Sequence, residues 1–394
     1  MKNQIILSLL AISGLASCSD NSDDNYEEIP SYPFVEAEFG STVDLGNLAN
    51  YANQTVPAYI IKDNSQGNLI TDKGATLGRV LFYDKNLSSN NTISCASCHK
   101  QEFAFSDTNV ASTGVNGTTG RHSMRLINSR FASETKFFWN ERALNLETQT
   151  TMPIKDHGEM GFSGENGDLS FDDLITKLSA IGYYKELFKF VYGTEEITEA
   201  KIQSALAQFI RSIQSFDSKY DAGRALATND GQPFSNFTAQ ENQGKNLFLS
   251  PPVFNTNGVR TSGGLGCAGC HRAPEFDIDP NTLNNGIIGT IAGTGIDTGN
   301  TRAPSLRDLV RTDGTTNGPM MHTGVITTLQ AAIGHYGTIN LAPGNNNLDP
   351  RLTPGGVGQQ LNLTATEVNA VIAFLRTLSG TDVYTNTKWS NPFN

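Results

Sequence analysis

Two short stretches of this chain, TISCASCHK at residues 92–100 and GLGCAGCHR at residues 264–272, contain the same pattern, Cys-x-x-Cys-His. In each, two thiols stand three residues apart and an imidazole follows at once. This spacing is typical of c-type haem attachment, in which both thiols form thioethers with the haem vinyl groups and the His reaches the iron. The expected attachment residues are Cys95, Cys98 and His99 in the first motif, and Cys267, Cys270 and His271 in the second.

Two other chemistries also use paired cysteines. A zinc site built from four Cys would leave the His after each pair unexplained, and a thioredoxin-like dithiol needs a βαβ setting that the surrounding sequence lacks. The chain has five Cys, four of them in close pairs, which differs from the dispersed cysteines of a disulfide framework. We therefore expect two covalently bound haem c groups, one in each half of the chain.

The amino-terminal segment, residues 1–18, has the features of an export signal. Lys2 gives a positive start, a short apolar run follows, and the segment ends in Leu-Ala-Ser-Cys, which resembles the cleavage site of a lipoprotein. The apolar run is too short to span a bilayer. A plain secretory peptide with an incidental Cys is the alternative. Lipid on Cys18 would anchor the protein on the periplasmic side of the cell envelope, with residues 19–45 as a flexible tether.

The composition excludes some classes of protein. The chain has 394 residues, of which 38% are hydrophobic, so it can form sizeable cores in two or three domains. Its net charge of −11 argues against nucleic acid as a partner, since phosphate binding needs a basic face.

Apolar periodicity predicts a mainly α-helical fold with long loops. Helical spacing occurs within 75–84, 171–192 and 198–216, with Thr198 as an expected N-cap, and strand signals are scarce. Two more helices are expected to begin at Thr238 and Thr364. Because each half has a short helix, a Cys-x-x-Cys-His motif, a loop and a further helix, we expect two cytochrome c-like haem domains. The expected boundaries are 46–228 and 229–394.

Further motifs follow the two Cys pairs in a definite order. They are FFWNERALNLETQ (137–149) and MPIKDHGEMGF (152–162) in the first half, and TRAPSLRDL (301–309), PMMHTG (319–324) and LQAAIGHY (329–336) in the second. Together they resemble the bacterial dihaem cytochrome c peroxidase family. That family includes the dihaem enzyme that matures the tryptophan-derived cofactor of methylamine dehydrogenase.

The resemblance implies that the first haem, with His99 as its proximal ligand, reacts with peroxide. Glu159 corresponds to the family's catalytic carboxylate, and Gln149 and Pro153 to residues of the distal pocket. Trp139 corresponds to the Trp between the two haems. A carboxylate with a raised pKa can move a proton from the inner to the outer peroxide oxygen. From the residues alone, Glu159 would be a surface loop acid and Trp139 a core residue.

Two positions differ from the peroxidases of this family. Val115 stands where they have a His that binds the resting first haem, which predicts an open iron position at rest. Tyr336 stands where they have the Met ligand of the second haem, as in the cofactor-maturing branch. A phenolate ligand would lower the haem potential. His335 is the rival ligand, and neighbouring helical residues point in different directions, so both cannot bind the iron.

The resemblance also implies a calcium ion between the haems and arginines that pair with haem propionates. The calcium would be held by the backbone carbonyls of Asn317 and Pro319. His122, however, replaces the Asn that helps to hold it, and imidazole is a poor calcium ligand, which argues against this ion. Arg302 and Arg307 are the expected partners of the propionates.

The leading hypothesis is an exported dihaem peroxidase that reduces hydrogen peroxide with electrons from a small cytochrome or copper protein. The alternative is a protein-modifying oxidase, in which both haems store oxidising equivalents and a partner's Trp or Tyr is oxidised. A non-enzymatic electron carrier is the third hypothesis, and it needs two strong ligands on each iron. The resemblance also implies a homodimer, for which the sequence shows no interface.

Overall fold

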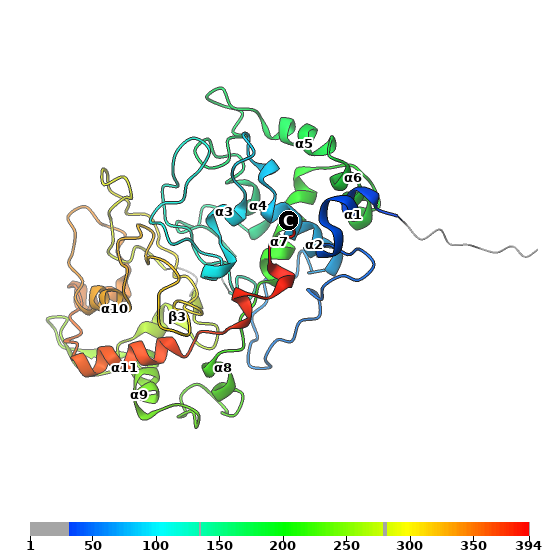
Figure 1. Cartoon of the computed structure of the whole chain (residues 1–394). Helices are drawn as coiled ribbons and strands as arrows, with labels where there is room; N and C mark the ends of the chain where they lie inside the picture. The colour runs from blue at the N-terminus through cyan, green and yellow to red at the C-terminus, as the bar shows by residue number, and fades with distance from the viewer. Residues whose placement is uncertain (1–30, 134, 279–281, 394) are drawn as a thin grey trace, which may run out of the picture. The chain divides into compact units, whose positions relative to one another are not determined.

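The protein is described here by a computed structural model that covers residues 31–133, 135–278 and 282–393. The expected signal segment 1–18, with Cys18, and the first part of the expected tether lie outside these residues. The described part is mainly helical and has two small antiparallel sheets, as the sequence predicts (Figure 1). Within it, no helix is long and apolar enough to cross a membrane.

Helices and strands alternate with long loops along the described chain. The α-helices are α1 (Pro33–Phe39), α2 (Asp72–Tyr83), α3 (Cys95–Cys98), α4 (Leu146–Thr151), α5 (Phe171–Ser179), α6 (Gly182–Tyr192), α7 (Glu199–Ser212), α8 (Lys219–Arg224), α9 (Ala239–Leu249), α10 (Leu329–Gly337) and α11 (Ala365–Arg376). The paired strands are β1 (Pro252–Phe254) with β2 (Arg260–Gly263), and β3 (His271–Arg272) with β4 (Asp277–Ile278). Short 3-10 turns include η3 (Gln101–Phe103), η4 (Cys267–Gly269), η7 (Asp382–Tyr384) and η8 (Thr387–Trp389).

The first hydrophobic core is built around α2 and α7. Thr71 and Thr198 begin these helices because each hydroxyl accepts a hydrogen bond from a backbone N–H of the first turn. The helices touch at Gly78, where a Cβ atom would lie 2.0 Å from the carbonyl oxygen of Ala205. The side chains around them, such as Phe209, are fully buried. Burying one such side chain contributes about 1.5–3 kcal/mol to the free energy of unfolding.

The second core repeats this arrangement with α9 and α11, which lie side by side in Figure 1. Thr238 and Thr364 each begin a helix with a capping box, as predicted. Gly244 allows the close approach, since a Cβ atom there would lie 1.9 Å from the carbonyl oxygen of Ala370. The two halves therefore share one local architecture, which agrees with the repeated Cys-x-x-Cys-His motif.

The folded part begins earlier in the chain than the sequence suggests. Residues 33–45 were expected to belong to a flexible tether, but α1 lies within them and buries Val35 and Phe39 in the first core. The carboxylate of Glu186 on α6 accepts hydrogen bonds from the N–H groups of Phe34 and Val35. These two bonds satisfy donors at the start of α1, so this segment packs as part of the core.

The stretch 171–192 was expected to be continuous in its helical spacing but forms two helices, α5 and α6. Ile181 has an extended backbone between them. At Gly182, a Cβ atom would lie 2.5 Å from the ring of Phe34 on α1. The helix therefore restarts at the point where α1 packs against it, a contact that the periodicity of 171–192 does not contain.

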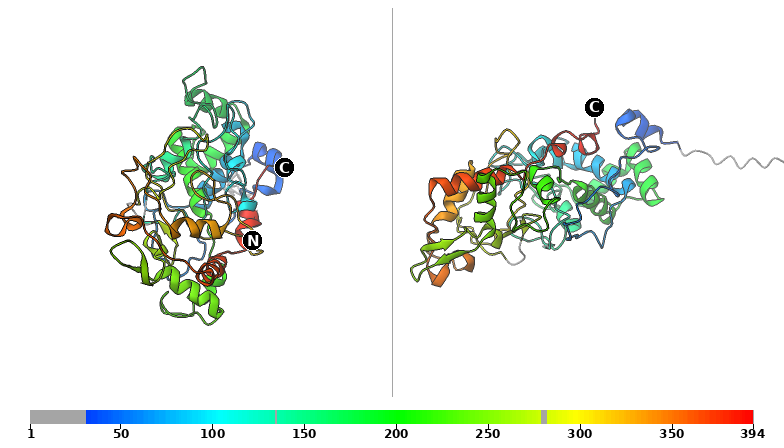
Figure 2. Two further views of the ribbon diagram at one scale, coloured as in Figure 1. Left: turned by 90° about the vertical axis from the view of Figure 1, so that its left-hand side faces the viewer. Right: turned by 90° about the horizontal axis from the view of Figure 1, so that it is seen from below.

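A C-terminal strap, residues 380–393, runs from α11 back to the first core, near α1 (Figure 2). Val383 and Trp389 are fully buried there. The hydroxyl of Tyr83 donates to the carbonyl of Trp389 at 2.6 Å, and Nε of Arg79 donates to the next carbonyl at 2.7 Å. Conversely, Tyr220 lies before the expected boundary at residue 228 but is buried in the second core. Each core thus contains residues from both sides of position 228, and the expected domain boundary there stays a prediction.

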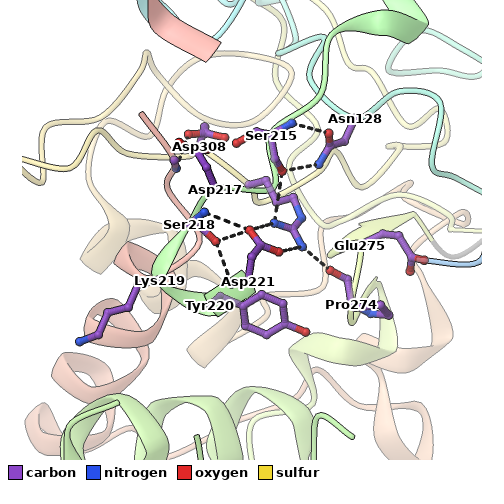
Figure 3. Close-up of polar contacts among 12 residues, drawn as sticks. Asn128, Ser215, Asp217, Ser218, Lys219, Tyr220, Asp221, Pro274, Glu275 and Asp308 are labelled. Carbon is purple, nitrogen blue, oxygen red and sulfur yellow. Dashed lines mark hydrogen bonds and ion pairs between the residues drawn. The ribbon is translucent and has the colours of Figure 1, made fainter. Parts of the chain in front are cut away.

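A buried ion pair lies close to the point where the chain passes from the first core to the second. The guanidinium of Arg307, which is fully buried, donates to both carboxylate oxygens of Asp221 at 2.9 and 3.0 Å. Figure 3 shows the polar contacts of this pair: the hydroxyl of Ser218 donates to Asp221, and the guanidinium of Arg307 also donates to the carbonyl of Pro274. Arg307 was expected to pair with a haem propionate. That expectation is wrong, because Asp221 takes its guanidinium and Arg307 lines neither cavity described below.

Candidate haem sites

The first haem motif lies on the short helix α3. A capping box between Ser94 and Ser97 begins it, and one helical turn places Cys95 and Cys98 on the same side. Both thiols and His99 line a cavity of about 310 Å³, the first cavity. Burial raises the pKa of Cys95 to about 12 and that of Cys98 to about 11, so both are thiols at neutral pH. Neither forms a disulfide.

The imidazole of His99 is oriented by a backbone carbonyl. Its Nδ1 lies 3.0 Å from the carbonyl oxygen of Phe105. Because a carbonyl only accepts, Nδ1 carries the proton and Nε2 keeps its lone pair. Ala104 and Phe105 both have left-handed backbone, with φ of 55° and 58°, and this turn brings the carbonyl back to the ring. Burial lowers the pKa of His99, so the ring is neutral and suited to bind iron.

Three side chains assigned to the distal pocket lie together in the first cavity. They are Glu159, Gln149 and Pro153. Asp156 shapes the loop that carries Glu159, because its Oδ1 accepts from the N–H groups of Gly158 and Glu159 at 2.9 and 3.0 Å. Burial, helped by the charge of Asp156, raises the pKa of Glu159 to about 7. Glu159 is thus poised to exchange a proton near neutral pH.

Val115 packs against the loop that carries Glu159 and does not line the first cavity. Its N–H donates to the carbonyl of Glu159 at 3.0 Å. The neighbouring Gly114 permits this contact, since a Cβ atom there would lie 2.1 Å from the carbonyl oxygen of Gly158. The two loops are therefore packed backbone to backbone. The open iron position that Val115 implies stays a prediction.

The second motif lies at η4 and β3. Cys267, Cys270 and His271 line a cavity of about 550 Å³, the second cavity. Burial raises the pKa of Cys267 to about 12 and lowers that of His271 to about 4. The imidazole is therefore neutral at pH 7, as an iron ligand requires.

Tyr336 and His335 are both on α10, but they have different surroundings. Tyr336 lines the second cavity, and burial raises the pKa of its hydroxyl. His335 is not among the lining residues, and its Nε2 lies 2.9 Å from the carbonyl oxygen of Asn285. Met321 lines the cavity as well. The side-chain amide of Asn285 makes long contacts of 3.5 Å with the Tyr336 hydroxyl and the Met321 sulfur.

Trp139 lies between the two cavities and lines both. It is 8% exposed, and its Nε1 donates to the carbonyl of His122 at 2.7 Å. The ring of His322 packs edge-on against it at 6.3 Å between centroids. Of the residues that the structure describes, six line both cavities: His122, Ser123, Met124, Arg125, Trp139 and Arg302.

The expected calcium ligands lie close to this junction. Asn317 is fully buried, and its side-chain amide donates to the carbonyl of Asp308 and to the hydroxyl of Tyr384, both at 2.7 Å. Pro319 lines the second cavity. Nδ1 of His122 lies 3.0 Å from the carbonyl oxygen of Asn109. Within the described ranges, no cluster of three or more His, Cys, Asp or Glu could hold a metal ion.

Arg125 is a site residue that the sequence motifs do not reveal. It lies three residues after His122 in the stretch RHSMRLIN (121–128), and nothing in that stretch marks it as facing both cavities. Its Nη2 donates to the carbonyl of Ser305 at 2.8 Å, and its Nε is buried without a partner among the described residues. Arg302, which was expected at a propionate, also lines both cavities.

Each cavity has the groups that a c-type haem requires. A pair of thiols and a neutral imidazole stand at one wall, most of the lining is apolar, and guanidinium groups lie where the cavities meet. Thiols can form thioethers, imidazole can bind iron, and guanidinium can pair with propionate carboxylates. The residues present therefore fit one haem in each cavity.

Comparisons with known proteins agree with this reading. The sequence profile described as "Di-haem cytochrome c peroxidase" matches residues 72–229. Methylamine utilization protein MauG of Methylorubrum extorquens is 30% identical over 69% of this chain and 70% of its own length. Cytochrome c551 peroxidase of Nitrosomonas europaea is 28% identical over 78% of this chain and 80% of its own. A crystal structure of a MauG-like protein associated with microbial copper homeostasis covers 86% of this chain and 99% of its own, with a TM-score of 0.66 and 28% identity.

The chain therefore belongs to the di-haem cytochrome c peroxidase family. Membership implies an oxidoreductase with two haem c groups, for which the two Cys-x-x-Cys-His motifs are the attachment sites. The relatives include proteins named as peroxidases and proteins named for methylamine utilization.

Proposed function

We propose that this protein is a dihaem c-type cytochrome peroxidase that reduces hydrogen peroxide to water with electrons from a small cytochrome or copper protein. The observation that carries the proposal is the position of Glu159. Its side chain lines the cavity that also contains the first motif, and its pKa is raised to about 7. An acid–base group beside an iron site is what peroxide cleavage needs, whereas an electron carrier has no use for one.

In the proposed reaction, hydrogen peroxide takes up two electrons and two protons, its O–O bond breaks and two waters form. Bound haem supplies the iron at which peroxide binds and which exchanges the electrons. Glu159, as a carboxylate, accepts the proton of the inner oxygen and delivers it to the outer oxygen, which leaves as water. Gln149 lines the same cavity, where its amide orients the peroxide.

Electrons reach this site from the second cavity. Trp139 lines both cavities, and its indole is held by the hydrogen bond to the carbonyl of His122. A large, rigid π-system in that position can pass an electron between the two halves. We therefore assign Trp139 as the electron bridge.

A second candidate is the protein-modifying oxidase, in which a partner's Trp or Tyr is the electron source. Tyr336 favours it, because this hydroxyl lines the second cavity while His335 does not. An anionic oxygen ligand stabilises oxidised iron, which suits storage of oxidising equivalents. We propose Tyr336 as the sixth ligand of the second haem.

Replacing Tyr336 by Phe tests this ligand. We expect the low-spin electron paramagnetic resonance (EPR) signal of the second haem to change and its midpoint potential to rise, because an anionic donor is lost. His335→Ala is the matched variant and should leave that signal in place, since the ring of His335 faces the carbonyl of Asn285. An unchanged spectrum for Tyr336→Phe would eliminate Tyr336 as the ligand.

The pH dependence of turnover tests the peroxidase function. The active form of Glu159 is the carboxylate, and its pKa is about 7, so kcat/KM for peroxide should fall as the pH drops below about 7. The measurement is peroxide consumption with a reduced small cytochrome, for both the fully oxidised and the half-reduced protein. No turnover in either state would refute the peroxidase, and a pH-independent rate would refute the role of Glu159 alone.

The remaining expectations concern the setting of the enzyme. We propose that Cys18 carries a lipid anchor and that the protein faces the periplasm. A homodimer is a further proposal. A calcium ion at Asn317 and Pro319 would lack a ligand from His122, because this imidazole faces the carbonyl of Asn109.

A further inference from the structure

We propose that Arg125 is a carboxylate-binding residue shared by both haem sites, where it pairs with propionate groups of the two cofactors. The proposal goes beyond the peroxidase function, because it rests only on the two haem groups that the family implies. It concerns what sets the two midpoint potentials rather than how peroxide is cleaved.

The position of Arg125 supports a shared role. It follows the first motif in the chain and lines the first cavity, yet it lines the second cavity as well. Its Nη2 donates to the carbonyl of Ser305, in the segment after the second motif, at 2.8 Å. That bond joins the two halves and holds the guanidinium at their junction. The planar group still has donors for partners on either side.

The charge of Arg125 lacks a matching anion in the described part of the chain. Its Nε is buried and makes no hydrogen bond there. Asp308 acts on it electrostatically but forms no ion pair with it. Oδ1 of Asp308 accepts from the N–H of Gly380 and the hydroxyl of Tyr384, and its Oδ2 is buried without a hydrogen-bond partner among the described residues. Burial lowers the pKa of Arg125 to about 10, which reflects the poor solvation of the cation.

Buried guanidinium groups elsewhere in the molecule show how such a charge is usually met. Arg307 pairs with Asp221, and Arg211 pairs with Glu147. Arg79, also buried, is met by two backbone carbonyls instead. Arg125 has one such carbonyl and a buried Nε without a partner among the described residues, so an anionic partner that enters the cavities would complete its contacts. Propionate is the carboxylate that a haem provides, and arginine binds carboxylates through paired donors.

A shared cation has a measurable electrical effect. Positive charge beside a haem stabilises its reduced form, because that form carries less positive charge. Since Arg125 faces both cavities, it raises both midpoint potentials together and leaves their difference nearly unchanged.

The test is a spectroelectrochemical titration of the dihaem protein, with each haem followed by its own spectrum. Arg125→Met should shift both midpoint potentials downward, and Arg125→Lys, which keeps the charge, should shift them less. Arg125→Gln is a second neutral variant that can still donate to the Ser305 carbonyl if the Met variant does not mature. Arg79→Met is the matched control, because Arg79 is buried against backbone carbonyls and lines neither cavity.

A parallel downward shift in a neutral variant, absent in Arg79→Met, supports the proposal. Unchanged potentials overturn it, and a shift of one haem alone overturns the shared role. The titration needs no peroxide, so its outcome is independent of whether the protein is a peroxidase.

Discussion

Glu159→Gln is expected to lower peroxide turnover by about 10²–10⁴-fold, the usual contribution of a positioned acid–base group. The amide fills the same space and can donate a hydrogen bond, but it cannot accept the peroxide proton. Haem content and the spectra of both haems should stay as in the unchanged protein, because Glu159 lines the first cavity but belongs to neither attachment motif. The measurement is kcat/KM for peroxide as a function of pH.

The pH profile distinguishes this role from a structural one. The fall in rate below about pH 7 should disappear in Glu159→Gln, since that is the pKa of the carboxyl removed. Glu165→Gln is the matched control: Glu165 is exposed nearby in the chain, outside the first cavity, and should turn over peroxide normally. If Glu159→Gln keeps both its rate and its pH profile, another residue moves the proton.

Arg307→Met is expected to lower the free energy of unfolding by about 3–5 kcal/mol. The substitution leaves the carboxylate of Asp221 buried beside Ser218 and the hydroxyl of Tyr59 but without its cation. The guanidinium lowers the pKa of Asp221 against the opposing effect of burial, so its loss exposes the full cost of the buried charge. Chemical denaturation followed by circular dichroism measures the change.

Two further variants make this result specific. Arg307→Met combined with Asp221→Asn should recover part of the loss, because both charges are then gone. Lys155→Met removes the cation of a largely exposed pair with Glu199 and should cost about 1 kcal/mol or less. Equal losses for Arg307→Met and Lys155→Met would mean that burial does not raise the cost of breaking the Arg307–Asp221 pair.

The parts of the structure that the sequence predicts are those with local causes. The caps at Thr198, Thr238 and Thr364 are confirmed, because a cap and its helix lie within a few residues. The two haem motifs are likewise complete within five residues each. Their local spacing is enough to place both thiols and the imidazole on one cavity wall.

The features that sequence patterns missed depend on residues far apart in the chain. The role of Arg125 is visible only when the carbonyl of Ser305 and both cavities are in place. The sequence predicts a propionate as the partner of Arg307. Its actual partner, Asp221, lies more than eighty residues earlier, so the motif around Arg307 does not reveal it. At the start of α6, Gly182 lies against the ring of Phe34, which is more than a hundred residues earlier in the chain.

The C-terminal strap has a consequence for how the protein is made. The first core is completed by Val383 and Trp389, and these residues come after the whole second core in the chain. Chains with independent domains can fold the first one while the next is still being synthesised. Here the first half stays unfinished until nearly the whole described chain has emerged. Haem can therefore be attached to the first motif before the C-terminal strap packs against the residues that follow that motif, such as Gln101.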